Sequence, residues 1–299
     1  MERKTILVTG ANGQVGTEFR QLAEVFTGFD FLFVGKEELP IEDNEAVTRF
    51  FKKHPIHYCI NCAAYTAVDK AETESERAYL VNATAAGNLA AACEEHQALF
   101  VHISTDYVFD GTATTPYQVN HPVNPVNLYG ASKLKGEQLA LQNNPGAIII
   151  RTSWVYAATG NNFVKTMLRL MSERESINVV SDQQGCPTYA ADLAAAIMQI
   201  VVQHSQKEEG QEFNTGSNIY HYSNSGITNW YEFATAIKDL AGKKCLVNAI
   251  SSSQYPTPAK RPFYSVMDTS RIQYTFGISI PFWKDSLLKC IEQIKGNAN

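Results

Sequence analysis

The first half of the chain alternates short apolar runs with stretches in which apolar residues recur at helical spacing. The strand-like runs are 5–9, 58–61, 99–104 and 147–151. The helix-like stretches are 14–26, 75–96 and 129–141. Strands and helices that alternate in this way predict an α/β fold, a doubly wound parallel (Rossmann) sheet with helices on both faces.

After residue 151 this rhythm loosens. The loop-rich segments are 181–188, 221–228 and 251–262, and the helix-like stretches are 228–241 and 281–294. We expect a dinucleotide-binding domain over 1–153 and a smaller C-terminal α/β substrate lobe, mainly over 154–299, with a return to the first domain near 179–217. Because no repeat or flexible linker separates the lobes, they should share a cleft at the carboxyl ends of the strands.

Composition narrows the class of protein. The chain has 299 residues, 44% hydrophobic and 18% charged, which is typical of a globular enzyme and not of a disordered chain. The net charge is −5 and no basic run is longer than Lys52-Lys53 or Lys243-Lys244, so no nucleic acid partner is expected. The apolar stretch 193–202 is about half a membrane span, and residues 1–10 lack a signal peptide's apolar region. We expect a cytoplasmic protein without membrane contact.

The six cysteines agree with a reducing compartment. Cys59 and Cys62 form the one close pair in the sequence, and residues three apart in a strand point to opposite faces. We therefore expect buried thiols, without a metal or redox centre.

A glycine pattern follows the first strand. Gly10, Gly13 and Gly16 have the Gly-x-x-Gly-x-x-Gly spacing and lead into a helix, the context in which such a loop binds a dinucleotide. Glycine permits the tight turn, and the free amides of the helix N-terminus meet the diphosphate. The residues between these glycines that should also contact the cofactor are Asn12, Gln14 and Val15.

The end of the second strand bears on the choice of cofactor. An acid at that position would bind the adenosine ribose and select NAD, but the run 31–34 leads into Gly35 and Lys36. A lysine there would attract a 2′-phosphate. NADPH is thus the expected cofactor, and use of NADH as well stays open.

Three side chains predict carbonyl chemistry. Tyr129 and Lys133 lie four residues apart on one helix face, and Thr105 ends an apolar strand at the same sheet edge. Thr105 would orient a carbonyl oxygen and Tyr129 would donate its proton. We expect the ammonium of Lys133 to lower the pKa of the phenol and to hold the nicotinamide ribose.

These motifs resemble the extended short-chain dehydrogenases/reductases, and further segments resemble one family among them, the dTDP-4-dehydrorhamnose reductases. The segments are 61–72, 104–111, 151–156, 182–188 and 260–262. The resemblance implies NAD(P)H-dependent reduction of the 4-keto group of dTDP-4-dehydro-L-rhamnose to dTDP-L-rhamnose, for a cell-surface polysaccharide. It also implies three residues beside the cofactor, Ala63, Ala64 and Tyr65. Around the sugar nucleotide it implies Val68, Thr105, Asp106 and Trp154.

Arg261 is a candidate for binding the substrate diphosphate, because a guanidinium binds phosphate bidentately.

The sequence departs from the family pattern at two places. Cys62 stands where alanine is usual. Some relatives form dimers through magnesium held by glutamates. Glu18 and Glu292 are present here, but the stretch 189–192 reads Tyr-Ala-Ala-Asp and offers no third glutamate. We expect no metal, and a monomer and a homodimer both stay open.

Three alternatives remain at this point. A sugar-nucleotide dehydratase would need Asp-Glu directly after the threonine, whereas Thr105 is followed by Asp106 and Tyr107. Another extended short-chain sugar-nucleotide reductase or epimerase would share the catalytic residues. A non-catalytic NADP-binding regulatory subunit is the third, and intact Thr105, Tyr129 and Lys133 argue against it.

Overall fold

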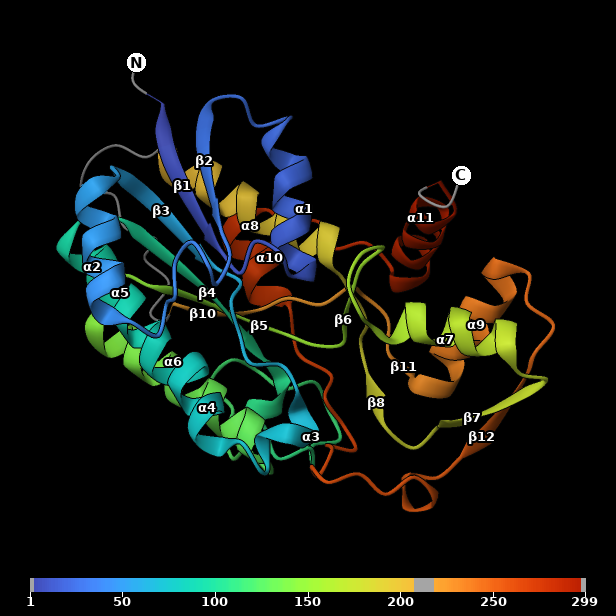
Figure 1. Ribbon diagram of the computed structural model, residues 1–299. Helices are drawn as coiled ribbons and strands as arrows, with labels where there is room; N and C mark the ends of the chain where they lie inside the picture. Colours follow the sequence, from blue (N-terminus) through green and yellow to red (C-terminus); the bar gives the residue numbers. More distant parts are fainter. Residues whose placement is uncertain (1–2, 207–217, 297–299) are drawn as a thin grey trace.

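The computed structural model describes residues 3–206 and 218–296. Six parallel strands form the main sheet in the order β10-β5-β4-β3-β1-β2. Their bounds are β1 Lys4–Thr9, β2 Phe29–Val34, β3 Ile56–Asn61, β4 Leu99–Thr105, β5 Ile148–Thr152 and β10 Ile219–His221. The strands β1, β3, β4 and β5 are short, apolar and almost wholly buried, because helices cover both faces of the sheet (Figure 1). The edge strand β2 is only partly buried.

Two helical layers enclose this sheet. One face packs against α1 (Gln14–Ala23), α8 (Ala190–Ser205) and α10 (Ser270–Phe276). The other face packs against α2 (Asn44–Lys53), α5 (Ala85–Glu95) and α6 (Leu128–Asn143). The predicted α/β fold, a parallel sheet with helices on both faces, is confirmed.

The segment 75–96, predicted as one helix, is interrupted. It forms α4 (Ser75–Tyr79), a π-helical turn (Leu80–Thr84) and α5, and a short helix α3 (Val68–Ala71) precedes it. A π-helical turn widens the helix by one residue and often lies at a functional site. Hydrophobic periodicity does not reveal such a turn, because the buried stripe continues across it.

The second lobe has its own core. It contains α7 (Phe163–Glu173), α9 (Trp230–Ala241) and α11 (Trp283–Gly296), packed around apolar residues such as Phe233 and Leu287. Three pairs of short strands complete it. They are β6 (Val155–Tyr156) with β9 (Thr188–Tyr189), β8 (Gln184–Gly185) with β11 (Thr228–Asn229), and β7 (Ser176–Val180) with β12 (Leu246–Ile250). Two short helical segments of the described residues remain, the 3₁₀ turns at Asp106–Val108 and Ser252–Gln254.

The chain crosses between the two lobes more than once. After β5 it enters the second lobe, returns to the sheet with α8 and β10, and returns again with α10 (Figure 1). Residues 207–217, part of the predicted return near 179–217, lie outside the described residues. The domain boundary at 153 stays a prediction.

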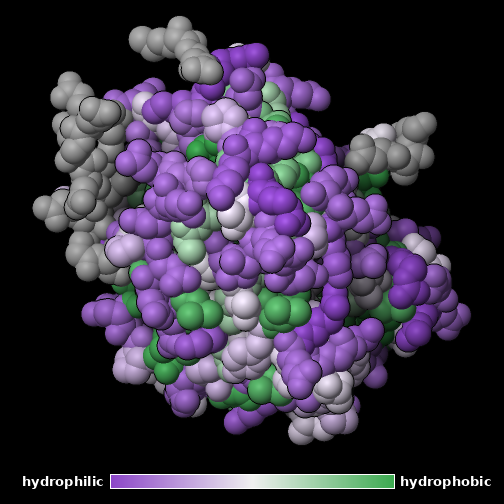
Figure 2. Space-filling model, turned by 60° about the vertical axis from the view of Figure 1, so that its left-hand side comes forward, coloured by the Kyte–Doolittle hydropathy of each residue, from purple (hydrophilic) through white to green (hydrophobic). Residues whose placement is uncertain are grey.

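Two surface properties complete the description. No helix within residues 3–206 and 218–296 is long and apolar enough to cross a membrane. Figure 2 brings forward the side of the molecule that carries α2 and α5, and this face is mainly hydrophilic, with hydrophobic residues in small separate patches. The view therefore shows no broad apolar surface.

Candidate active site

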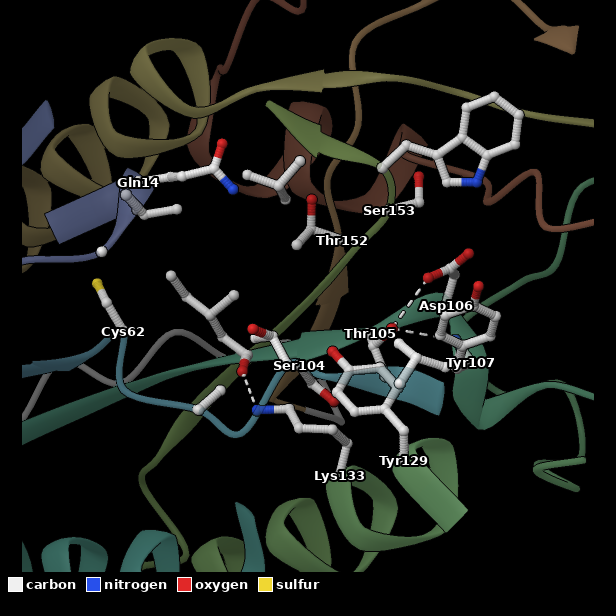
Figure 3. A pocket seen from close by; sticks show the side chains of 18 of the residues that line it. Gln14, Cys62, Ser104, Thr105, Asp106, Tyr107, Tyr129, Lys133, Thr152 and Ser153 are labelled. Atoms are coloured by element: carbon white, nitrogen blue, oxygen red, sulfur yellow. Dashed lines mark hydrogen bonds between the residues drawn. The ribbon is translucent and has the colours of Figure 1, made fainter. Parts of the chain in front are cut away.

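A cavity of about 600 Å³ lies at the carboxyl edge of the sheet, between the two lobes (Figure 3). The sheet domain contributes the loop after β1, the end of β4 and the first turns of α6. The second lobe contributes Trp154, Gly160 and Trp230. The cavity thus occupies the position where doubly wound sheets bind ligands. Val68, at the start of α3, also lines it.

The glycine loop lies between this cavity and a smaller one of about 310 Å³. Gly10 has φ +62°, and a Cβ atom there would lie 2.6 Å from the Ala63 nitrogen, so only glycine fits. Gly13 precedes the first turn of α1 and has no side chain to cap its amides. A diphosphate fits this position, because backbone amides and the helix dipole both favour an anion.

The other predicted cofactor residues surround the same two cavities. Those at the larger cavity are Asn12, Gly13, Gln14, Val15, Ala64 and Lys133. Those at the smaller cavity are Gly10, Gly13, Lys36, Ala63, Ala64 and Tyr65. Gly16 lines neither of them and is buried in the first turn of α1. Their shared location supports a single extended ligand across both cavities.

The surroundings of Lys36 correct the inference that the end of the second strand has no acidic side chain near it. The Lys36 side chain is 63% exposed and pairs with Glu42 at 3.4 Å. Glu38 Oε2 accepts a hydrogen bond of 2.8 Å from the Gly35 amide, so carboxylates do lie near this strand end. They were missed because both come from the loop after the lysine. Arg77 lines the same cavity and adds a second cation that the sequence did not indicate.

Asn82, in the π-helical turn, supports the cofactor loop. Its Oδ1 accepts from the Tyr65 amide at 2.8 Å, and its Nδ2 donates to the Tyr65 carbonyl at 3.0 Å and to Ser132 Oγ at 2.9 Å. This side chain ties the 62–65 loop to α6. No motif in the sequence pointed to Asn82, because its role depends on the turn.

Tyr129 enters the cavity from the start of α6. Asn127 caps this helix by accepting a 2.8 Å hydrogen bond from the Gly130 amide, and it donates to the Lys260 carbonyl of the second lobe at 2.9 Å. A Cβ atom at Gly130 would lie 2.2 Å from the Tyr107 carbonyl oxygen. The absence of a side chain at Gly130 lets the helix begin directly against the turn that follows β4.

Thr105 and Asp106 lie at the end of β4 and in the turn that follows it, against which the first turn of α6 packs. Thr105 Oγ1 donates to Asp106 Oδ1 at 2.9 Å and accepts from the Tyr107 amide at 3.2 Å (Figure 3). Asp106 is buried, and burial raises the pKa of its carboxyl to about 6 although Thr105 opposes the shift. The Asp106 carboxyl at the edge of the cavity is therefore mostly ionised at neutral pH and takes up a proton at a higher pH than an exposed aspartate does.

Tyr129 and Lys133 have different neighbours in the structure. Burial raises the pKa of Tyr129 to about 12, Thr105 opposes the shift through a hydrogen bond and Asp106 adds to it. Lys133 is not among these causes; its amine donates to the Ile103 carbonyl at 2.6 Å and lies 3.3 Å from His102 Nε2. The lowering of the phenol pKa by Lys133 stays a prediction. The raised pKa keeps Tyr129 protonated, and a proton donor must be protonated to act.

Trp154 lies between β5 and β6, where the chain enters the second lobe. Its φ is +49°, in the left-handed region. Its ring stacks on Trp230 with centroids 3.6 Å apart and planes 12° apart. A Cβ atom at Gly185 would lie 2.7 Å from the same indole, so that neighbour must also be small. Trp154 lines the cavity as predicted, but part of its ring surface already contacts Trp230, which the sequence analysis did not single out.

Arg261 reaches across the cleft to the sheet domain. Its two terminal nitrogens each donate to Asp69 at 2.9 Å, and the Ala259 amide donates to the same carboxylate at 3.2 Å. The bonds from Arg261 lower the pKa of Asp69. Arg261 lines a separate groove of about 400 Å³, which shares Trp230 with the main cavity. The guanidinium thus lies beside the cavity but is paired with a carboxylate.

A parallel dinucleotide-type sheet with Thr105, Tyr129 and Lys133 at its carboxyl edge, facing a second lobe across a cleft, defines an extended short-chain reductase. The model of the family described as "RmlD substrate binding domain" matches residues 4–295, and the chain belongs to this family. The family predicted from the motifs is thereby confirmed.

Three relatives illustrate the similarity. A dTDP-4-dehydrorhamnose reductase of Aggregatibacter actinomycetemcomitans is 41% identical over 94% of this chain and 96% of its own length. The spore coat polysaccharide biosynthesis protein SpsK of Bacillus subtilis is 39% identical over 96% and 97%. A crystal structure of dTDP-4-dehydrorhamnose reductase from Bacillus anthracis in complex with NADP has a TM-score of 0.89, with 38% identity over 98% of this chain and all of that one (100%).

Proposed function

We propose that this chain reduces the 4-keto group of dTDP-4-dehydro-L-rhamnose to dTDP-L-rhamnose with NADPH, a step that supplies rhamnose for a cell-surface polysaccharide. The observation that carries this proposal is the meeting of Thr105, Tyr129 and Lys133 at one cavity beside the glycine loop. Full-length relatives at about 40% identity act on the same sugar nucleotide by name.

The residues of the sheet edge would hold and protonate the carbonyl. Thr105 and Tyr129 are the two hydroxyl groups that can donate to its oxygen, and Tyr129 then transfers its proton as negative charge develops there. Because burial raises the pKa of Tyr129 to about 12, the phenol is protonated at neutral pH and ready to donate. When bound, NADPH supplies the hydride for the carbonyl carbon.

The glycine loop and its surroundings would hold the cofactor. The amides after Gly13 would bind the diphosphate, Lys36 and Arg77 are the cations for a 2′-phosphate, and Lys133 would bind the nicotinamide ribose. The Bacillus anthracis structure carries NADP, which supports the same cofactor here. Use of NADH as a second cofactor is part of the test.

The second lobe would bind the sugar nucleotide. Val68, Asp106 and Trp154 line the cavity around the position of the sugar. Arg261 would meet the diphosphate, provided that its contacts with Asp69 are exchanged for phosphate contacts. In that exchange one anion replaces another on the same guanidinium.

Turnover with dTDP-4-dehydro-L-rhamnose, NADPH and NADH tests the function directly. We expect oxidation of NADPH that depends on the sugar nucleotide, and formation of dTDP-L-rhamnose. Efficient reduction of a small ketone in place of the sugar nucleotide would overturn the substrate, and binding of NADPH without turnover would favour a regulatory role.

Two further properties belong to this proposal. We place the protein in the cytoplasm, supported by six cysteines that are all free thiols in the described structure. Fractionation of cells would test this. A monomer and a homodimer both stay compatible with the site, since every residue assigned above comes from one chain, and sedimentation analysis would distinguish them.

A further inference from the structure

A row of buried polar side chains crosses the sheet beneath the active site and ends at Lys133. Thr9 on β1 pairs in register with Asn61 on β3, and Asn61 pairs with His102 on β4. All four side chains, Lys133 included, belong to residues at most 1% exposed. These polar atoms are shielded from bulk water, so each needs a hydrogen-bond partner inside the protein.

The direction of the hydrogen bonds along this row can be worked out. The Ala63 amide can only donate, and it donates to Asn61 Oδ1 at 3.2 Å; Thr9 Oγ1 donates to the same oxygen at 2.7 Å. The Asn61 atom facing His102 Nδ1, at 3.0 Å, is therefore the amide nitrogen, which donates. Since His102 Nδ1 accepts, a neutral imidazole carries its proton on Nε2.

This tautomer faces Lys133. His102 Nε2 lies 3.3 Å from Lys133 Nζ, and Nζ also donates to the Ile103 carbonyl at 2.6 Å. An ammonium would oppose the N–H group of His102 with another donor, whereas a neutral amine has a lone pair that accepts it. We propose that His102 is a positioning residue that favours the neutral form of Lys133 through its Nε2–H group.

Burial and the neighbouring groups act on the pKa of Lys133 in opposite directions. The titratable neighbours of Lys133 are His102 from β4, Cys62 after β3 and Glu137 from α6 itself. Glu137 and Cys62 both raise the pKa of Lys133. Glu137 accepts two bonds from Arg151 of β5, at 2.9 and 2.7 Å, so its charge is already compensated. Burial keeps Cys62 a neutral thiol by raising its pKa, and burial together with Lys133 lowers the pKa of His102. Burial also lowers the pKa of Lys133 to about 8.

The consequence rests on the proposed function. If Lys133 must be an ammonium to bind the nicotinamide ribose, His102 sets the pH at which cofactor use declines. Loss of the His102 N–H group would remove a bond that stabilises the neutral amine, so Lys133 would keep its proton to higher pH. The alkaline limb of kcat/KM for NADPH would then move upward.

The first experiment measures this limb in His102→Phe, which keeps the size of the ring and removes both nitrogens. We expect a rise of about one pH unit, the effect of losing one ordinary hydrogen bond. An alkaline limb at the wild-type pH would overturn the inference.

The matched control is Thr9→Val. It removes a buried hydrogen bond from the same row, but the Ala63 amide still fixes the orientation of Asn61, so the His102 tautomer is unchanged. We expect the wild-type limb in this variant. An equal upward shift in Thr9→Val would show that general loosening of the row, and not the His102 N–H group, moves the limb.

A second measurement uses the wild-type protein and depends neither on turnover nor on the folding of a variant. Nitrogen-15 NMR of the wild-type imidazoles reports which ring nitrogen carries the proton. We expect His102 to be neutral and protonated on Nε2 from about pH 6 to about pH 9. A proton on Nδ1, or an imidazolium, would contradict the proposal even if the enzyme reduces a different substrate; absence of turnover alone would count against the proposed function only.

Discussion

The sheet edge and the second lobe line the same cleft but hold their residues by different means. Thr105, Tyr129 and Lys133 lie on β4 and α6, where regular hydrogen bonding and buried neighbours fix their backbone. Trp154 and Arg261 lie in loops, and their partners Trp230 and Asp69 come from distant parts of the chain. Groups that act on the reacting bond thus stand on rigid elements, whereas groups proposed to bind substrate rest on contacts that can exchange.

The comparison predicts that the largest effect on rate comes from the sheet edge. Tyr129→Phe removes the proton donor and keeps the ring, so we expect kcat to fall by about 10² to 10⁴ while the protein folds normally. Steady-state turnover with circular dichroism as the control measures this. Turnover within about threefold of wild type would remove Tyr129 from its role.

The next effect tests how rigid the sheet edge is. In Gly130→Ala the new Cβ atom would lie 2.2 Å from the Tyr107 carbonyl oxygen, so the first turn of α6 must shift. We expect a loss of about 1 to 3 kcal/mol in the free energy of unfolding, and lower kcat, although alanine normally stabilises a helix.

Gly28→Ala is its control, because a Cβ atom at that position meets no atom within 4 Å. Denaturant unfolding should show Gly28→Ala close to wild type. Equal stability of the two variants would mean that the contact between α6 and the Tyr107 turn is loose.

The second lobe should show its effect in substrate binding. Trp154→Ala removes an indole that lines the cavity, and we expect KM for the dTDP-keto sugar to rise about tenfold while affinity for NADPH changes little. Trp230→Ala, which frees the stacked face of Trp154, should also raise KM. A parallel loss of NADPH affinity in Trp154→Ala would show that this residue supports the fold of the cleft and does not select substrate.

The smallest effect concerns Lys36, an exposed residue at the smaller cavity. Since its side chain is 63% exposed and paired with Glu42, Lys36→Asp should shift the preference from NADPH toward NADH by only about fivefold. Glu42→Gln, which frees the lysine, should shift it slightly the other way. Ratios of kcat/KM for the two cofactors measure both, and a wild-type enzyme that prefers NADH would contradict the role of Lys36.

The sequence alone determined the fold class and the candidate catalytic residues at the edge of the sheet. Strand–helix alternation and the glycine spacing are local patterns, and they predicted the parallel sheet and the loop that begins at Gly10. Thr105 could be brought to the same edge as that loop because parallel strands all end on one side of a sheet. The spacing of Tyr129 and Lys133 placed them on one helix face for an equally local reason.

Only the tertiary structure decided what those residues touch. Asp69 on Arg261, Trp230 on Trp154 and His102 beside Lys133 are contacts between elements distant in sequence. Their geometry depends on strand register, on the packing of α6 against the sheet and on the approach of the second lobe. The raised pKa of Tyr129 also depends on the tertiary structure, because burial is its main cause. How much solvent a side chain loses is set by the packing of the whole molecule and not by the residues next to it in the sequence.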